Sequence, residues 1–225
     1  MESFCPLHID LKERACLVIG GGAVAERKVK VMLAYRAAVT VVSPAIGSYL
    51  SDLVISGKIG CINDIYRPAY LKNRFIVICA TDNAEVNRKA AEDCIERGIP
   101  VNSVSEPDKC TFFLPALLKK GPLTVTVATA GSSPALSRRI RDHLDSALDP
   151  EYEAYIRYLG AIRPQVIARV ACHSARRSIF EYLAGDDFFS VFTTRERSVT
   201  EDFVEQLLVN EEEKTVLSSE EEGSR

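Results

Sequence analysis

The sequence predicts an α/β protein in which a doubly wound parallel sheet is followed by a connecting strand region and a small helical domain. Over roughly the first hundred residues, short apolar runs alternate with stretches of helical periodicity, which is the pattern of βαβ units. A glycine-rich turn joins the first apolar run to the first helical stretch. After Pro150 the periodicity is helical only, and this change of pattern predicts a separate helical part.

The first half of the chain is expected to hold five strands. Their expected ranges are Ala15–Gly20, Ala38–Val42, Lys58–Ile62, Phe75–Ala80 and Ile99–Val104. Phe75–Ala80 is continuously apolar, as strands buried in a parallel sheet are, whereas Lys58–Ile62 is a weaker strand. Helices with one apolar face are expected between them: Val24–Tyr35, Ile46–Ser56 and Ala84–Arg97. Strands and helices that alternate in this order favour parallel pairing with crossover helices.

The second half is expected to begin with two strands, Phe112–Leu114 and Leu123–Ala128, separated by a turn at Lys119–Pro122. Helices are then expected at Ser133–Leu148, Tyr152–Ala171, Ser174–Ala184 and Thr200–Leu208. Proline removes a backbone donor and clashes with the preceding helical turn. Pro164 is therefore expected to interrupt the second of these helices.

Composition and charge narrow the class of protein. The 225 residues contain no apolar run long enough to span a bilayer, and the first residues do not resemble a signal peptide, so we expect a cytoplasmic protein without a membrane partner. The last 25 residues hold nine acidic and two basic side chains, which leaves 26 basic and 22 acidic ones in the first 200, a net charge of +4. This mildly basic body favours an anionic small molecule over a nucleic acid.

The seven cysteines are widely spaced and include no C-x-x-C pair. We therefore expect ordinary reduced thiols and no metal site.

The strongest motif is Gly20-Gly21-Gly22-Ala23-Val24-Ala25, which reads G-x-G-x-x-A between a predicted strand and a predicted helix. Such a turn lets the backbone approach a pyrophosphate at a helix N-terminus, so it predicts a Rossmann-type dinucleotide site. The alternative is a glycine-rich turn that binds nothing. At the end of the second strand, Ser43 is neutral and leaves NAD and NADP open as cofactors.

Polar residues follow two later strands at the edge where ligands of such sheets bind. Thr81 and Asp82 come after the Phe75–Ala80 strand and are candidates to line the cofactor, or else to cap the next helix. In the Asn102–Asp108 segment, Glu106 and Asp108 are candidates for proton transfer and Ser105 for a hydrogen bond to substrate. The alternative for each is a polar turn.

The loop Thr129-Ala130-Gly131-Ser132-Ser133 precedes a predicted helix whose first turns carry Arg138, Arg139 and Arg141. Small residues at a helix N-terminus, followed by arginines, are suited to gripping carboxylates. The alternative is an ordinary capped helix with solvated arginines.

Together these motifs resemble the precorrin-2 dehydrogenase family, the NAD-dependent module of siroheme synthesis, which occurs alone or as the N-terminal part of siroheme synthase. The resemblance covers residues 5–150 well and residues 151–208 only in helical character. The segments that carry it are Pro6-Leu7, Asp10-Leu11, Gly20–Lys28, Ala80–Asp82, Val86-Asn87, Asn102–Pro107, Phe112–Pro115 and Gly131–Leu136.

The resemblance implies NAD-dependent oxidation of precorrin-2 to sirohydrochlorin by a homodimer. It implies contacts to the pyrophosphate from Gly20, Gly22, Ala23 and Val24, and to the adenosine ribose from Ser43, Pro44 and Ala45. It also implies that Asn102 and the Thr129–Ser133 loop face the tetrapyrrole.

The sequence patterns and the resemblance together predict four parts of the chain. They are a dinucleotide-binding domain (1–112), a connecting and dimerisation region (113–149), a helical domain (150–210) and a disordered acidic tail (211–225).

One position departs from the family pattern. The siroheme-synthase modules have an aspartate, proposed for proton transfer and metal insertion, where this chain has Ser105. Ser105 and Glu106 remain the catalytic candidates, and the departure weakens iron insertion more than hydride transfer. Two alternatives stay open: a bifunctional dehydrogenase and ferrochelatase, and a dinucleotide sensor without enzymatic activity.

Overall fold

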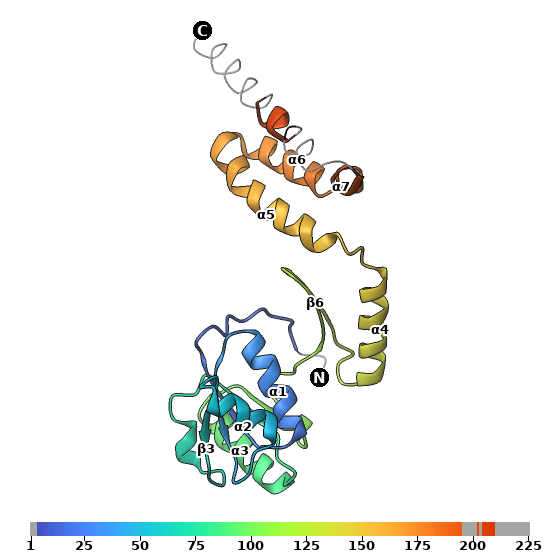
Figure 1. Ribbon diagram of the computed structural model, residues 1–225. Helices are drawn as coiled ribbons and strands as arrows, with labels where there is room; N and C mark the ends of the chain where they lie inside the picture. Colours follow the sequence, from blue (N-terminus) through green and yellow to red (C-terminus); the bar gives the residue numbers. More distant parts are fainter. Residues whose placement is uncertain (1–3, 195–201, 203, 210–225) are drawn as a thin grey trace. The chain divides into compact units, whose positions relative to one another are not determined.

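The computed structural model describes residues 4–194, 202 and 204–209, and the chain divides into two compact units after Leu114 (Figure 1). The first unit is a five-stranded sheet of order β3-β2-β1-β4-β5 in which every pair of neighbours is parallel. Its strands are β1 (Ala15–Ile19), β2 (Ala38–Val42), β3 (Gly60–Ile62), β4 (Ile76–Cys79) and β5 (Val101–Ser103). This is the doubly wound sheet that the alternation of apolar runs predicts.

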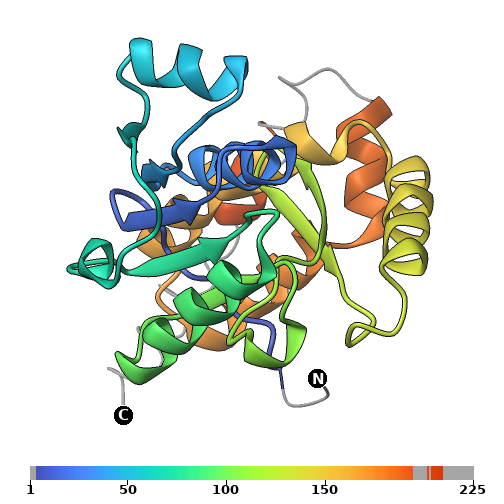
Figure 2. The same ribbon diagram turned by 90° about the horizontal axis from the view of Figure 1, so that it is seen from below.

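Helices cover both faces of this sheet because successive strand residues point to opposite sides. The helices are α1 (Ala23–Ala34), α2 (Ser48–Ile55) and α3 (Ala84–Glu96), with short 3-10 helices η1 (Pro68–Leu71) and η2 (Pro107–Lys109). Cys16 and Val18 of β1 pack with α1 and α2, whereas Leu17 and Ile19 pack with α3. Figure 2 shows α1 in blue and α3 in green on opposite sides of the strands.

The strand order places a topological switch between β1 and β4. From β1 the chain moves outward through β2 to β3, and it then returns to pair β4 with the other side of β1. The loops that leave the carboxyl ends of β1 and β4 therefore diverge to opposite faces, which opens a crevice where ligands of such sheets bind.

The second unit contains a β-hairpin and helices. The hairpin joins β6 (Ala116–Lys120) to β7 (Leu123–Val127) through a two-residue turn, in which Gly121 has a positive φ of 55°. The helices are α4 (Pro134–Ala147), α5 (Tyr152–Arg169), α6 (His173–Leu183) and α7 (Asp186–Thr194). Residues of α5, α6 and α7 share one apolar cluster that is rich in aromatic rings.

Two predictions about this half need correction, and one helix was missed. Phe112–Leu114 is not a strand: these residues are half-buried against the core formed with α1 and α2, and the hairpin begins only at Ala116. Pro164 lies inside α5 without ending it. The helix α7 was not predicted at all.

Packing explains the continuity of α5. Tyr155, Tyr158, Ile162 and Val166 lie on one helical face and are all buried, so the same cluster holds the helix before and after the proline. The exposed Pro164 loses one backbone hydrogen bond, and the shared packing offsets that loss.

The expected helix at Thr200–Leu208 lies partly outside the described residues. Residues 202 and 204–209 are helical, and Val204 and Leu208 are buried in the aromatic cluster. The expected acidic tail, 211–225, lies outside the described residues. In the described part of the chain, no helix is both long and apolar enough to cross a membrane. All seven cysteines lie in that part, and none forms a disulfide.

Candidate functional site

The glycine turn after β1 is held tightly between two other loops. Gly20 has a φ of 121°, and a Cβ atom there would lie 2.4 Å from the carbonyl oxygen of Ala80. A Cβ atom on Gly21 would lie 2.0 Å from the carbonyl oxygen of Ala45. Because heavy atoms cannot approach so closely, both positions require glycine, and their first task is to bring three loops together at the carboxyl edge of the sheet.

Gly22 has a different environment. It is the N-cap residue of α1, it supplies no capping side chain, and a Cβ atom added to it would meet nothing within 4 Å. Gly22 and Ala23 are exposed, so the first N–H groups of the helix face open space. An uncapped helix N-terminus carries partial positive charge and unpaired donors. These residues fit the pyrophosphate of a dinucleotide, since open space lies where its oxygens would approach.

The loop after β2 contacts this turn. The Gly47 N–H donates to the carbonyl oxygen of Gly21 over 3.0 Å. The Ser43 side chain is buried and donates to the carbonyl oxygen of Ala45 over 2.6 Å, whereas Pro44 and Ala45 are exposed. Ser43 therefore shapes the loop, and the exposed surface next to the glycine turn is that of Pro44 and Ala45.

At the end of β4, a buried asparagine holds the chain. Asn87 of α3 is 0% exposed, and its Oδ1 accepts from the Thr81 backbone N–H (3.1 Å) and the Thr81 hydroxyl (2.8 Å). Its Nδ2 donates to the Thr81 carbonyl oxygen and to Ser105 Oγ, both over 3.0 Å. The side chain of Asn87 thus links the ends of β4 and β5. Asp82 is exposed, and Asn83, not Asp82, caps α3.

Two further polar side chains of β5 point into the protein. Asn102 is 5% exposed, and its Nδ2 donates to the Phe112 carbonyl oxygen over 3.1 Å. The Cys110 thiol accepts from the Ser103 N–H and donates to the Ser103 carbonyl oxygen. Asn102 Oδ1 and Ser103 Oγ have no hydrogen-bond partner among the described residues. Asn102 therefore holds the segment that follows η2, and in this structure its side chain does not line an open surface.

Ionisable groups around β5 are also paired or buried. Glu106 is paired with Arg88 of α3 (Nε to Oε1, 3.5 Å) and is half-buried. Burial raises the pKa of the Cys110 thiol and lowers that of the Lys28 amine on α1. Cys110 therefore stays protonated at neutral pH and acts as a small hydrogen-bonding core residue.

The predicted loop Thr129–Ser133 lies in the second unit, and its side chains form hydrogen bonds within the loop and at the start of α4. Thr129 Oγ1 accepts from the Ser133 N–H, and Ser133 Oγ caps α4 by accepting from the Leu136 N–H. Ala130 and Gly131 have positive φ values of 48° and 80°. The side chains of Thr129 and Ser133 are thus used within the loop. Exposed residues that remain for a ligand include Gly131, Ser132 and, further along α4, Arg138 and Arg139.

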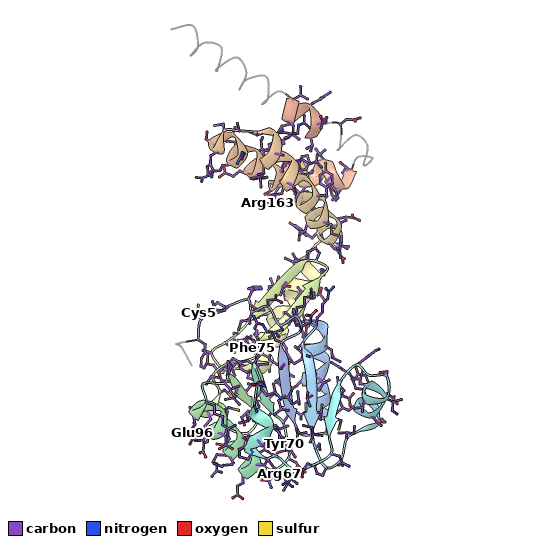
Figure 3. The ribbon with its side chains drawn as sticks, turned by 90° about the vertical axis from the view of Figure 1, so that its left-hand side faces the viewer. Cys5, Arg67, Tyr70, Phe75, Glu96 and Arg163 are labelled. Carbon is purple, nitrogen blue, oxygen red and sulfur yellow. The ribbon has the colours of Figure 1, made fainter. Side chains whose placement is uncertain are left out.

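A cavity of about 460 Å³ lies elsewhere in the second unit, beside α5 and α6. Arg163, which Figure 3 labels, stands 4.6 Å above the ring of Phe180 there. None of the predicted site residues lines this cavity: its lining consists of Arg163, Ile167, His173, Arg176, Arg177, Phe180, Glu181 and Ala184.

Asn87 is not among the site residues predicted from the sequence. A usable signal exists in the predicted helix: positions 87, 90, 91 and 94 share one face, and the other three are alanine or cysteine. A polar side chain on such a face must find partners when it is buried. The pattern thus predicts a buried hydrogen bond at Asn87, although not the residues that form it.

The open glycine turn, the switch between β1 and β4, and the polar ends of β4 and β5 define a dinucleotide-binding protein of the Rossmann class. In the described residues, no group of three or more histidine, cysteine or acidic side chains is arranged to hold a metal ion.

Comparison with known proteins identifies the family. Residues 7–116 match the family described as putative NAD(P)-binding, and residues 120–147 match the central domain of sirohaem biosynthesis proteins. The siroheme synthase of Nitrosomonas europaea is 34% identical over 208 residues, which are 92% of this chain and 44% of the relative. That of Methylobacillus flagellatus is 36% identical over 176 residues, which are 78% and 38%.

A solved structure, that of the precorrin-2 dehydrogenase SirC, matches with a TM-score of 0.75 and 27% identity and covers 91% of this chain and 98% of that protein. The chain belongs to the precorrin-2 dehydrogenase family, the dinucleotide-binding module of siroheme synthases. The predicted Rossmann-type fold is thereby confirmed. The chain spans less than half of the length of the siroheme synthases that it matches.

Proposed function

We propose that this chain oxidises precorrin-2 to sirohydrochlorin with NAD⁺ as the acceptor, in the cytoplasm. The observation that carries the proposal is the open, uncapped glycine turn after β1, in a chain that matches nearly all of SirC. In this reaction the substrate loses two electrons and two protons: a hydride passes to the cofactor and the remaining proton is released to solvent.

Residues of the glycine turn and of the loop after β2 have separate roles in binding the cofactor. Gly20 and Gly22 let the backbone approach the pyrophosphate, and the N–H groups of Ala23 and Val24 donate to it. Pro44 and Ala45 form the wall beside the adenosine ribose. The family description of an NAD(P)-binding domain supports this arrangement. The bound cofactor supplies the hydride acceptor, while the protein binds and orients both reactants.

For the substrate, we propose that Thr81 and Asp82 flank the reacting end of the cofactor, with Ser105 and Glu106 at the neighbouring strand end. Gly131, Ser132 and Arg138 of the second unit offer exposed backbone and side-chain donors for carboxylates. The hydrogen bonds of Asn102, Thr129 and Ser133 hold these segments in shape.

Turnover under anaerobic conditions tests the function. Freshly generated precorrin-2 is mixed with the protein and NAD⁺, with NADP⁺ or without cofactor, and the visible spectrum is followed. We expect sirohydrochlorin to form with NAD⁺. A second series with ferrous or cobaltous ion tests the chelatase alternative, for which we expect no protein-dependent metal insertion. Binding of NAD⁺ without any conversion of precorrin-2 would reject the dehydrogenase and favour the sensor.

We also propose a homodimer that is formed through the region 113–149. The two-stranded β6–β7 sheet packs against α4, and Leu136 and Ile140 of this helix remain exposed large apolar residues. A second copy of this region would cover them. A molar mass from light scattering that corresponds to one chain would reject this assembly.

A further inference from the structure

The orientation of the Asn87 amide is fixed by a backbone group on each side. The Thr81 N–H can only donate a hydrogen bond, and the Thr81 carbonyl can only accept one. Oδ1 of Asn87 lies 3.1 Å from the former and Nδ2 lies 3.0 Å from the latter. The reversed amide would set two donors against each other and two acceptors against each other. The oxygen and nitrogen of this side chain are therefore assigned by chemistry.

This assignment fixes the role of Ser105. The second hydrogen on Nδ2 of Asn87 is directed at Ser105 Oγ over 3.0 Å, so the serine oxygen is the acceptor of that bond. A hydroxyl has one hydrogen to donate, and Ser105 makes no other side-chain hydrogen bond among the described residues. Its hydrogen is consequently available to a third group.

The two ends of this contact differ in exposure. Asn87 is completely buried, whereas Ser105 is exposed where the chain leaves β5, beside the end of β4. The amide thus holds the serine oxygen from the protein interior, and the hydroxyl hydrogen is left for the solvent side. That side is the carboxyl edge of the sheet, where the ligands of this fold bind.

We propose that Ser105 donates a hydrogen bond to an acceptor oxygen of a bound ligand, and that Asn87 is the positioning residue that sets the direction of this bond. The inference rests on the function proposed above, which supplies two such acceptors: a carboxylate of the tetrapyrrole and the carboxamide oxygen of the nicotinamide. Ser105 is then a binding group for a reactant. It is not the base that takes the proton released in the oxidation.

The test compares Ser105→Ala with Ser105→Thr, which keeps the hydroxyl. We expect Ser105→Ala to weaken the binding of one reactant about 10-fold, because the lost bond goes to a polar or charged acceptor. Ser105→Thr should restore most of that binding. A higher KM for precorrin-2 with an unchanged Kd for NAD⁺ identifies the substrate carboxylate, and the converse identifies the nicotinamide. Ser178→Ala, at an exposed serine of α6, should change neither constant.

Asn87→Asp tests the positioning role with a side chain of the same size. A carboxylate still accepts from the Thr81 N–H, but it can donate neither to the Thr81 carbonyl oxygen nor to Ser105 Oγ, so the serine hydrogen turns inward toward it. We expect the same loss of binding as in Ser105→Ala. The double variant should lose little more than either single variant. The thermal melting curve and, if the substrate is the acceptor, the Kd for NAD⁺ report whether the variant keeps its fold.

Different outcomes overturn different statements. If Ser105→Ala slows turnover by about two orders of magnitude and also removes one limb of the pH profile of kcat/KM, Ser105 is a proton-transfer group and the inference is overturned. Additive losses in the double variant overturn the positioning role of Asn87. Failure of the proposed function looks different, because the unmodified chain then binds NAD⁺ without turnover.

Discussion

We expect Gly22→Asp to fold as stably as the unmodified chain and to lose NAD⁺ binding by at least about 100-fold. The φ and ψ of Gly22 are −87° and −174°, which any residue adopts, and a Cβ atom meets nothing within 4 Å. Aspartate is also a favoured N-cap residue, so the free energy of unfolding should change by less than about 0.5 kcal/mol. The new carboxylate occupies the space next to the helix N-terminus and repels the pyrophosphate, which costs several kcal/mol.

Gly22→Asn is the matched control for this variant. Asparagine has the same shape and caps the helix equally well, but it carries no charge. If the pyrophosphate lies at the α1 N-terminus, the asparagine variant should retain more affinity than the aspartate variant, and the difference should shrink at high salt because the repulsion is screened. Calorimetric titration with NAD⁺ and chemical denaturation measure the two quantities. If the unmodified chain and both variants bind NAD⁺ with equal affinity, the pyrophosphate does not lie at the N-terminus of α1.

The sheet and its glycine turn were predictable because the signals are local. Strands β1 and β4 are uninterrupted apolar runs, β2 is rich in β-branched residues, and the glycine turn lies directly between β1 and α1. Since parallel strands end at one edge, the same reasoning also placed Thr81 and Ser105 at the same edge of the sheet. Their observed link through Asn87 agrees with that placement.

Features that depend on distant contacts were not predictable. The role of Asn87 follows from groups 6 and 18 residues away, and no short pattern encodes them. The continuity of α5 through Pro164 depends on the aromatic cluster formed with α6 and α7. For Thr129 and Ser133 the sequence left two alternatives, carboxylate binding and helix capping, and hydrogen bonds within the loop account for the side chains of both.

Replacing Gly20, the first glycine of the motif, should have the opposite effect to replacing Gly22, because it should change the stability of the fold. We expect Gly20→Ala to lower the free energy of unfolding by about 3 kcal/mol, whether or not NAD⁺ is present. The residue has a φ of 121°, and its Cβ would lie 2.4 Å from the Ala80 carbonyl oxygen. That oxygen cannot easily retreat, because the Ala80 N–H is bonded to the Ile19 carbonyl oxygen over 2.8 Å at the end of the β1–β4 pair.

Gly57→Ala separates backbone strain from this clash. Gly57 also has a positive φ, 68°, but a Cβ there meets nothing within 4 Å. Its replacement should therefore cost only about 1 kcal/mol. Denaturant unfolding of the two variants without ligand measures the difference, which isolates the contact between the glycine turn and the end of β4. If both variants lose the same stability, the turn does not pack against β4 as tightly as the 2.4 Å approach requires. The glycine would then be needed only for its backbone conformation.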